Sequence, residues 1–462
     1  MSGHDENHPS SIGSRIPTDD GRALQRAHRD PYAQSVLDAR LGRPARDVLE
    51  ATVVLEAWTG RPAQDAMRSA SDLVTLDGPP VNALSRVDPF ADSERTSVIS
   101  EGVTLVLLIV SIAAWAAPIS RELGGDVLGH AIRVALPIAV AIQWGLRSRY
   151  LGRPHGLACL ARDGLAFWAL LLVAIDVPLL FQSGWGPVAA MLIPIWVGGA
   201  VLTRRGWGLI YAGVLVVGTI ALSNGLQPYA VLGALTAVTL AMCIAAVHSR
   251  RERTDARAGS AARAVMAALI GGLLGVLLVA DPTLSWGVHG THPALALIPS
   301  VIGSYWGGYY LWNFYDAVPR GLRGVSLKRA GGIGFSDPAM AIFVGALARL
   351  IGATAVLSAV VIALSDRFGG TDEVSVFIAF GCVGTVSMLI GLLESFALQW
   401  AALLAAAAAL ATELACVSLS LTHAPGGALA AGATVGVLVT LPVLLVRLAR
   451  SGRVLATTMW IQ

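Results

Sequence analysis

Two stretches of sequence decide the fold: HAIRVALPIAVAIQWG at residues 130–145 and HPALALIPSVIGSYWG at residues 292–307. Each begins with a histidine, has a proline near its middle and ends in a Trp-Gly pair, at the same spacings. The first stretch lies in the second apolar segment of the chain and the other in the eighth. Recurrence at equal spacing indicates an internal repeat. We therefore predict six helices followed by six more in the same orientation, as in transporters built from two like-oriented halves.

The composition is typical of a membrane protein. Hydrophobic residues make up 55% of the 462 residues and charged residues only 14%, with a mean hydropathy of +0.66. Soluble domains contain roughly 25% charged residues. The sequence before residue 100 has no apolar run long enough for the core of a signal peptide. We expect a multi-pass protein of the cell inner membrane, with both termini in the cytoplasm.

Apolar stretches long enough to cross a bilayer recur along the chain. A crossing helix needs about 18 to 25 such residues to span roughly 30 Å of hydrocarbon. Twelve stretches of this kind predict twelve transmembrane helices. They begin near Gly102, Val127, Gly164, Gly186, Gly206, Tyr229, Ala264, Pro293, Pro338, Val374, Phe396 and Gly427.

The charges of the loops support this count, because Arg and Lys collect on the cytoplasmic side. With the N-terminus inside, the inner loops and tail carry eighteen Arg and Lys, whereas the outer loops carry only Arg121 and Arg367. A missed span would move every later loop to the wrong side. The predicted fold class is therefore an all-α membrane protein with a 6+6 parallel repeat. Its parts are an N-terminal six-helix bundle (99–248), a basic cytoplasmic linker (249–263), a C-terminal six-helix bundle (264–448) and a cytoplasmic tail (449–462).

Residues 1–98 have a different, mildly acidic composition and a repeat of their own, GRPARD at 42–47 and GRPAQD at 60–65. Proline in the first turn of a helix loses no hydrogen bond, so each copy predicts a helix start. We expect a disordered start over residues 1–30, a helical hairpin at about 44–74 and a Pro-rich linker to the membrane. So small a core is marginal alone. The arm is therefore expected to bind the membrane domain, a cytoplasmic glycosyltransferase or another partner from a synthesis complex.

Four ionisable residues fall inside the predicted spans, where each costs about 2.5 to 3.5 kcal/mol. For Arg133 and Arg349 we predict binding to anionic groups of a substrate, because a guanidinium can hold a phosphate with two hydrogen bonds. Snorkelling to the membrane surface is the alternative. For Asp176 and Glu413 we predict coupling to an ion or a proton. An ion pair with either arginine explains these acids equally well.

Aromatic residues crowd the end of the eighth span. Flat rings with polar tips can stack on sugar rings or on a lipid headgroup, which predicts a substrate entry. The alternative is an aromatic belt at the cytoplasmic interface. The residues predicted to bind substrate here are Tyr305, Trp306, Tyr309 and Trp312.

Motifs for nucleophilic, metal and nucleotide chemistry are missing from the sequence. The four cysteines form no C-x-x-C pair, and the basic residues are spread over short loops rather than gathered on one face. We therefore expect no catalytic residues, no metal, no cofactor and no nucleic-acid partner. One enzymatic alternative stays open: a membrane glycosyltransferase with a lipid-phosphate sugar donor, using Glu122 and Asp126 in the first outer loop.

With two bundles of six, long basic loops after spans two and eight, and Arg133 and Arg349 inside the membrane, residues 100–460 resemble a known family. This family comprises the polysaccharide and lipid-linked oligosaccharide exporters, the flippases of the multidrug/oligosaccharidyl-lipid/polysaccharide superfamily. The resemblance implies alternating-access transport of an amphiphilic anionic molecule, such as a lipid-linked glycan or exopolysaccharide precursor. The long N-terminal arm departs from that family. A membrane scaffold of an envelope or polysaccharide synthesis complex is the alternative.

Overall fold

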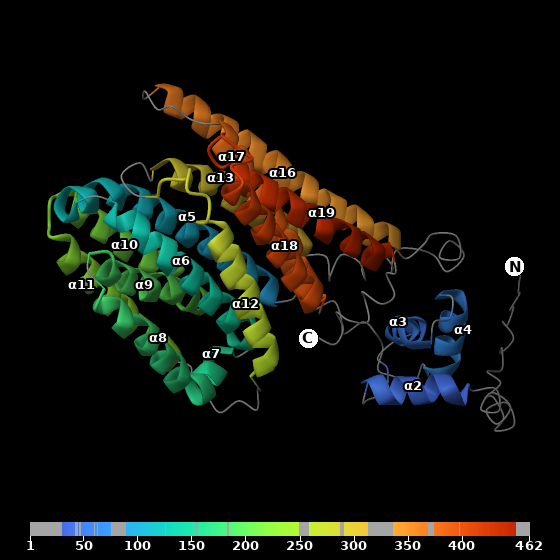
Figure 1. Ribbon diagram of the computed structural model, residues 1–462. Coiled ribbons are helices and arrows are strands. Elements are labelled where there is room, and N and C mark those ends of the chain that lie inside the picture. Colours follow the sequence, from blue (N-terminus) through green and yellow to red (C-terminus); the bar gives the residue numbers. More distant parts are fainter. Residues whose placement is uncertain are drawn as a thin grey trace, which may run out of the picture. The chain divides into compact units, whose positions relative to one another are not determined.

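A computed structural model describes residues 30–41, 45, 48–59, 61, 63–74, 89–124, 126–152, 156–182, 184–248, 258–286, 291–312, 336–367, 374–396 and 398–449. The regular elements in these ranges are all helices (Figure 1). The chain divides into two compact units, Met1–Ser85 with Arg450–Gln462 and Arg86–Ala449. The predicted disordered start, Pro-rich linker and cytoplasmic tail lie almost wholly outside the described residues.

The N-terminal unit contains three helices, α2 (Pro31–Leu41), α3 (Val48–Thr59) and α4 (Ala63–Leu73). Helices α3 and α4 lie in the range of the predicted hairpin, whereas α2 lies ahead of it. Small and branched side chains from all three helices share one core. Helix α2 covers apolar side chains that α3 and α4 alone would leave exposed. The buried members of this core are Ala33, Leu37, Ala51, Val54, Leu55, Ala66, Ala70 and Leu73.

Asp30 fixes the start of α2. Its Oδ1 accepts hydrogen bonds from the backbone N–H groups of Tyr32 (3.0 Å) and Ala33 (3.1 Å), which the helix itself leaves unpaired. Asp30 also forms an ion pair with Arg61, from the second copy of the repeated GRPA sequence. The Ala33 N–H and then the Arg61 side chain lower the pKa of Asp30 below its ordinary value of 3.8. The carboxylate is therefore ionised and stabilising at neutral pH.

The described part of the membrane unit consists mainly of apolar helices. Nine helices of the described residues are long and apolar enough to cross a membrane. Three shorter apolar segments, Gly208–Ser223, Ala261–Leu277 and Pro293–Ser304, lie where three more spans were predicted. A helix of 16 residues such as Gly208–Ser223 covers about 24 Å, less than the roughly 30 Å of hydrocarbon. Apart from the one-turn helix α7 (Gly156–Cys159), the α-helices of the membrane unit are α5 (Pro89–Leu123), α6 (Val127–Leu146), α8 (Leu165–Leu180), α9 (Gly186–Arg205), α10 (Gly208–Ser223), α11 (Pro228–His248), α12 (Ala261–Leu277), α13 (Thr291–Trp312), α16 (Ser336–Arg367), α17 (Val374–Ser395), α18 (Gln399–Ser418) and α19 (Gly427–Ala449).

Two helices are central to the packing of this unit. Helix α9 packs against α5, α6, α8, α10 and α11, and 83% of its apolar window is buried. Helix α17 packs against α13, α16, α18 and α19, and 56% of its window is buried. In the other candidate spans this share is 39% or less. The remaining apolar helices thus surround two buried ones.

Side chains of the surrounding helices donate hydrogen bonds to the backbone of α9. The Gln143 amide donates to the Trp196 carbonyl (2.7 Å), the Tyr211 hydroxyl to Ile195 (2.5 Å) and the Thr236 hydroxyl to Met191 (3.1 Å). A buried polar side chain in an apolar bundle needs such a partner, because neither lipid nor core side chains can supply one. These bonds also fix the rotation of α6, α10 and α11 about α9.

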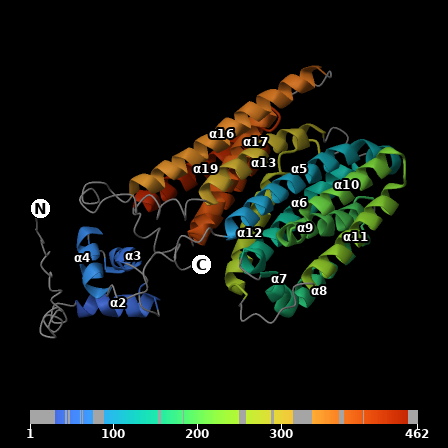
Figure 2. The ribbon, with the colours of Figure 1, turned by 180° about the vertical axis from the view of Figure 1, so that it is seen from behind.

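The helices α12 and α13 connect the first group of helices to the second. Figures 1 and 2 show them in yellow, between the blue-green helices α5 to α11 and the orange-red helices α16 to α19. Helix α12 packs along α6 and also contacts α18, while α13 packs on α5 and also on α16 and α17. Each of the two therefore contacts both groups.

The contact between α6 and α12 is one of backbone against backbone. A Cβ on Gly271 would lie 2.8 Å from the Trp144 side chain and 2.9 Å from the Val140 carbonyl oxygen, and one on Gly275 would lie 2.5 Å from the Pro137 Cα. None of these distances leaves room for a side chain. Small residues at such positions allow helices to approach closely in a bilayer, where van der Waals contact is a main source of association energy.

We predict that Gly275→Ala lowers the free energy of unfolding by about 1 to 3 kcal/mol, because the added methyl group overlaps Pro137. The matched control is Gly272→Ala on the same helix, whose Cβ would lie at an ordinary 3.5 Å from the Ala141 Cβ. This control should change stability by no more than about 0.5 kcal/mol. Thermal unfolding of the purified variants in detergent measures both, and equal effects would contradict the described α6–α12 contact.

We predict that Asp30→Ala increases amide hydrogen exchange in residues 31–41 about fivefold, which corresponds to the roughly 1 kcal/mol of a helix cap. Asp38→Ala is the control, because Asp38 accepts only an exposed hydrogen bond from the Gln34 amide. Exchange followed by mass spectrometry of the whole chain at neutral pH gives the comparison. The cap of α2 is refuted if the two variants exchange alike. Since the pKa of Asp30 is lowered in the fold, its contribution should disappear as the pH falls below 3.8.

Candidate functional site

The eight residues predicted to bind substrate or an ion do not converge on one place in the described structure. They lie on α6, α8, α13, α16 and α18. Helix α8 packs mainly on α9, whereas α18 packs on α12, α17 and α19, so Asp176 and Glu413 have separate surroundings. Each of these residues therefore has to be judged by its own environment.

The two intramembrane arginines have different surroundings. Arg133 on α6 is half-buried, and its Nε is buried without a hydrogen-bond partner among the described residues. Arg349 is exposed on α16, within an apolar window from Phe343 to Leu364. A guanidinium on the outer surface of an apolar helix reaches lipid headgroups, whereas a half-buried one is available to a ligand inside the bundle.

Asp176 lies on a peripheral helix, α8, one side of which packs on α9. Helix α8 has no buried residue, yet the Oδ1 atom of Asp176 is buried and has no hydrogen-bond partner within the described part of the chain. The predicted alternative of an ion pair with Arg133 or Arg349 is not found for these described residues. Asp176 thus has one carboxylate oxygen buried without a donor among the described residues.

The aromatic cluster at the end of α13 is described only in part. Trp306 is 60% exposed, so its ring faces away from the bundle. Tyr305, Tyr309 and Trp312 belong to α13, and their side chains lie outside the described set. On another face of α13, Gly307 packs on Ala346 and Leu350 of α16. An exposed Trp306 is compatible both with a lateral substrate entry and with an aromatic belt.

The first histidine of the repeated stretch has a structural role. The Nδ1 of His130 lies 2.8 Å from the carbonyl oxygen of Asp126 and 3.7 Å from its Oδ2, one turn before it at the start of α6. His130 is exposed, as is Glu122 at the end of α5. Of the two acids of the glycosyltransferase alternative, Glu122 is thus exposed and Asp126 lies beside His130. His292 belongs to α13, and its side chain is outside the described residues.

Glu413 has the most unusual environment of the predicted residues. Its side chain on α18 is completely buried, and neither carboxylate oxygen has a hydrogen-bond partner among the described residues. Its charge interacts with Asp281, a second buried acid, in the turn after α12. Asp281 was not among the predicted site residues. It lies outside the predicted spans, and no sequence pattern places residue 281 beside residue 413.

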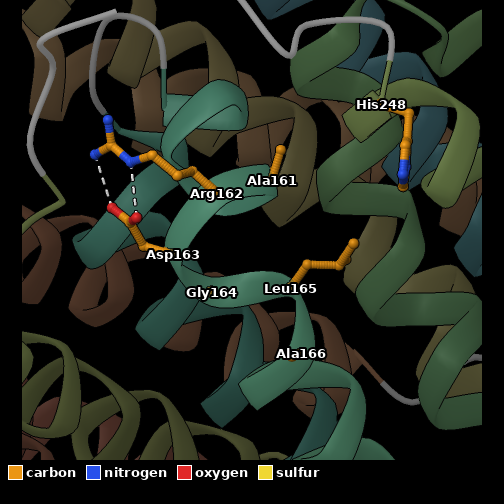
Figure 3. Close-up of a pocket in the computed structure, with 7 residues that line it drawn as sticks. All are labelled: Ala161, Arg162, Asp163, Gly164, Leu165, Ala166 and His248. Carbon is orange, nitrogen blue, oxygen red and sulfur yellow. Dashed lines mark hydrogen bonds and ion pairs between the residues drawn. The ribbon is translucent and has the colours of Figure 1, made fainter. Parts of the chain in front are cut away.

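A pocket of about 240 Å³ lies apart from all of these residues, and Figure 3 shows its lining. It is bordered by residues 161–166, at the start of α8, and by His248 at the end of α11. Arg162 donates two hydrogen bonds of 2.7 and 2.8 Å to the Asp163 carboxylate, and the two opposite charges neutralise each other. None of the predicted site residues lines this pocket, so it has no claim to the predicted chemistry.

The described part of the chain is all-helical, and its long apolar helices are those of a membrane-embedded protein. Comparison with protein-family models, with curated proteins and with solved structures gives no match to this chain. Any more specific function has to be argued from the residues and helices themselves.

We predict that Asp176→Asn raises the melting temperature of the purified protein at neutral pH, because it removes an acid that has no donor in an apolar environment. Asp163→Asn is the control. It removes the negative charge and one of the two acceptor oxygens that face Arg162, at a more exposed position, and should lower the melting temperature slightly or leave it unchanged. A marked loss of stability in Asp176→Asn would mean that a partner for this acid has been missed.

Proposed function

We propose that this protein is a secondary transporter or flippase with two like-oriented halves of six transmembrane helices. Its substrate is an amphiphilic anionic molecule, such as a lipid-linked glycan or exopolysaccharide precursor, and transport proceeds by alternating access. The membrane is the cell inner membrane, with both termini in the cytoplasm. The single observation that carries this proposal is that three helix pairings of the first group recur between the same ordinal positions of the second.

The recurring pairings follow the order of the helices along the chain. In the first group, the first helix packs on the fifth (α5 on α10), the second on the fourth (α6 on α9) and the fourth on the sixth (α9 on α11). In the second group, α12 packs on α18, α13 on α17 and α17 on α19, which are the same ordinal pairs. The contacts between groups are also reciprocal, since α12 packs on α6 and α13 on α5. In these contacts the first helix of one group packs on the second helix of the other, as expected of two halves related by a two-fold axis.

Two further features support the repeat. The most buried helices, α9 and α17, are the fourth of each group. The glycines that end the repeated stretches also correspond. A Cβ on Gly145 would meet Trp168 of α8, and one on Gly307 would meet Ala346 of α16, each on the third helix of its group. Six crossings return the chain to its starting side, so halves of six helices have the same orientation.

The charges support an anionic amphiphile as substrate. Arg133 is half-buried, and its guanidinium Nε has no hydrogen-bond partner in the described part of the chain. It lies on α6, the helix that contacts α12 of the other half. Arg349 and Trp306 are exposed on neighbouring helices α16 and α13, where a lipid-borne phosphate and a sugar ring would meet them from the bilayer. Asp176 and Glu413 are the acids proposed to couple transport to an ion.

A membrane scaffold is the second candidate function, and the N-terminal unit favours it. This unit has its own core, and it exposes Trp58 with the Arg40 guanidinium stacked 3.7 Å from the ring centre. An exposed aromatic residue with a stacked arginine is typical of protein interfaces. The scaffold would recruit a glycosyltransferase or another enzyme of envelope synthesis through residues 1–98.

We predict that α10 crosses the membrane although it has only 16 residues. In a variant whose four cysteines are replaced, single cysteines would stand at Arg204 and Asn224, which flank α10. A membrane-impermeant maleimide should label Asn224→Cys in intact cells and Arg204→Cys only after permeabilisation. His423→Cys, after α18, should behave like Asn224→Cys. Labelling of Arg204→Cys and Asn224→Cys from the same side would contradict twelve crossings.

We predict that Arg133→Gln abolishes function while the protein still accumulates in the membrane, and that Arg133→Lys keeps part of it, because the cationic charge is retained. Complementation of a deletion strain, with protein quantified in the membrane fraction, measures both. A scaffold would instead tolerate Arg133→Gln and fail when residues 1–98 are removed. The double result of a tolerated Arg133→Gln and a failed truncation would overturn the transport proposal.

A further inference from the structure

The carboxyl group of Glu413 is buried in a way that an ionised acid does not tolerate. The residue has no exposed surface, and both oxygens lack a hydrogen-bond partner among the described residues. The backbone N–H of Asp281 faces this carboxyl group without reaching hydrogen-bond geometry. A buried charge without partners costs several kcal/mol, so the group must be neutralised.

Asp281, beside it, has the opposite surroundings. Its Oδ1 accepts hydrogen bonds from the Thr283 N–H (2.9 Å) and from the Thr283 hydroxyl (2.6 Å). Its Oδ2 faces the Leu429 N–H (3.4 Å) in the first turn of α19, where the helix dipole is positive. Three donors and a helix N-terminus stabilise an ionised carboxylate at Asp281, and they leave Glu413 as the member of the pair that has to be neutral.

From this asymmetry we propose that Asp281 and Glu413 form a proton-binding site in which Asp281 stays ionised and Glu413 carries one exchangeable proton. On opening to water, the Glu413 O–H bond breaks and the proton passes to water, leaving a second carboxylate. On closing, the same bond forms again. No oxidant, metal or further reactant takes part.

The helices that pack on α18 carry no basic residue at the level of Glu413. Helix α6, which packs on α12, carries Arg133 one turn before its Pro137–Gly275 contact, but among the described residues Asp281 is the only charged group found to act on the Glu413 carboxyl. Within the described ranges, α12 carries Arg263 in its first turn, α17 carries Glu394 in its last turn, and α19 carries Arg447 near its end. All three are at the end of the unit remote from Asp281, which directly follows α12. His423 is exposed in the turn between α18 and α19.

A metal cation suits this site less well than a proton. A hard cation such as Ca²⁺ takes six to eight oxygen ligands. The oxygens of Asp281 already accept from donors, and the Thr283 Oγ1 accepts the Gly426 N–H at 2.9 Å while its own proton is donated to Asp281. The described residues contain no group of three or more His, Cys, Asp or Glu side chains able to hold a metal.

The proposed role of this proton in coupling rests on the proposed transport function, but the proton site itself does not. Glu413 lies on α18 and Asp281 follows α12, and these two helices pack on each other. A movement that separates α12 from α18 would admit water to the pair. Loading and release of the proton would then follow the movement of the halves.

Infrared spectroscopy of the full-length purified protein tests the site without any transport measurement. Wild type should show the carbonyl band of a neutral carboxylic acid at neutral pH, and the band should shift in D₂O as the proton exchanges. Glu413→Gln, an isostere of the neutral acid, should fold normally and lack that band. The exposed Glu122→Gln is the control and should retain it.

The site is refuted if wild type and Glu413→Gln have the same carboxyl bands, or if the band appears only when Na⁺ is replaced by choline, which would indicate a bound metal ion. The D₂O shift of wild type gives an answer even if Glu413→Gln fails to fold. A Glu413→Gln protein that lacks the band but fully complements a deletion strain would leave the proton site intact and refute its role in coupling.

Discussion

The membrane unit depends on the backbone contact between α6 and α12. Inside a bilayer, apolar side chains gain little by leaving lipid for protein, so helices associate where their shapes allow close contact. Gly271 and Gly275 provide that shape, and they bring the backbone of α12 onto Pro137 and Val140 of α6. Because α12 also packs on α18, this contact connects the two groups of helices. The reciprocal contact of α13 with α5, built on Ile109, Ala113 and Ala294, makes the second connection.

Polar groups inside the unit fall into two classes, and the difference is informative. Gln143, Tyr211 and Thr236 donate to carbonyl oxygens of α9 and hold its neighbours in place. Arg133 and Glu413 instead have buried atoms without partners among the described residues. Satisfied groups stabilise the fold, whereas unsatisfied ones weaken it and are retained where a ligand or a proton completes them. Among the predicted site residues, Asp176 shares this lack of a described partner through its Oδ1 atom.

Much of the helical layout could be predicted from the sequence, and the reason is physical. Apolar runs bounded by Arg, Gly and Pro mark helices in a bilayer, so nine predicted spans coincide with described helices long and apolar enough to cross it, and the other three coincide with shorter apolar helices. Helix length is less predictable. Helix α5 begins at Pro89, before its apolar part, because a helix can continue into water, and Gly208–Ser223 ends after 16 residues. Helix α2 was missed because its apolar residues are few and acquire a core only with α3 and α4.

The site was less predictable than the fold. Intramembrane charges can be read from a sequence, but their neighbours depend on tertiary packing. That is why Arg349 turned out to be exposed, why Asp176 has no ion pair among the described residues, and why Asp281 was overlooked although it lies beside Glu413. Burial without a hydrogen-bond partner is a property of the fold and has no counterpart in a single sequence.

The central claim is that two six-helix halves move against each other, and distances between them test it most directly. Pulsed electron spin resonance on the reconstituted protein would use spin labels at Asn224 and His423 as one pair, and at Arg204 and Trp400 as the other. The account predicts two distance populations for each pair, with one pair widening as the other narrows when the pH is changed. A single, unchanged distance for both pairs would contradict alternating access.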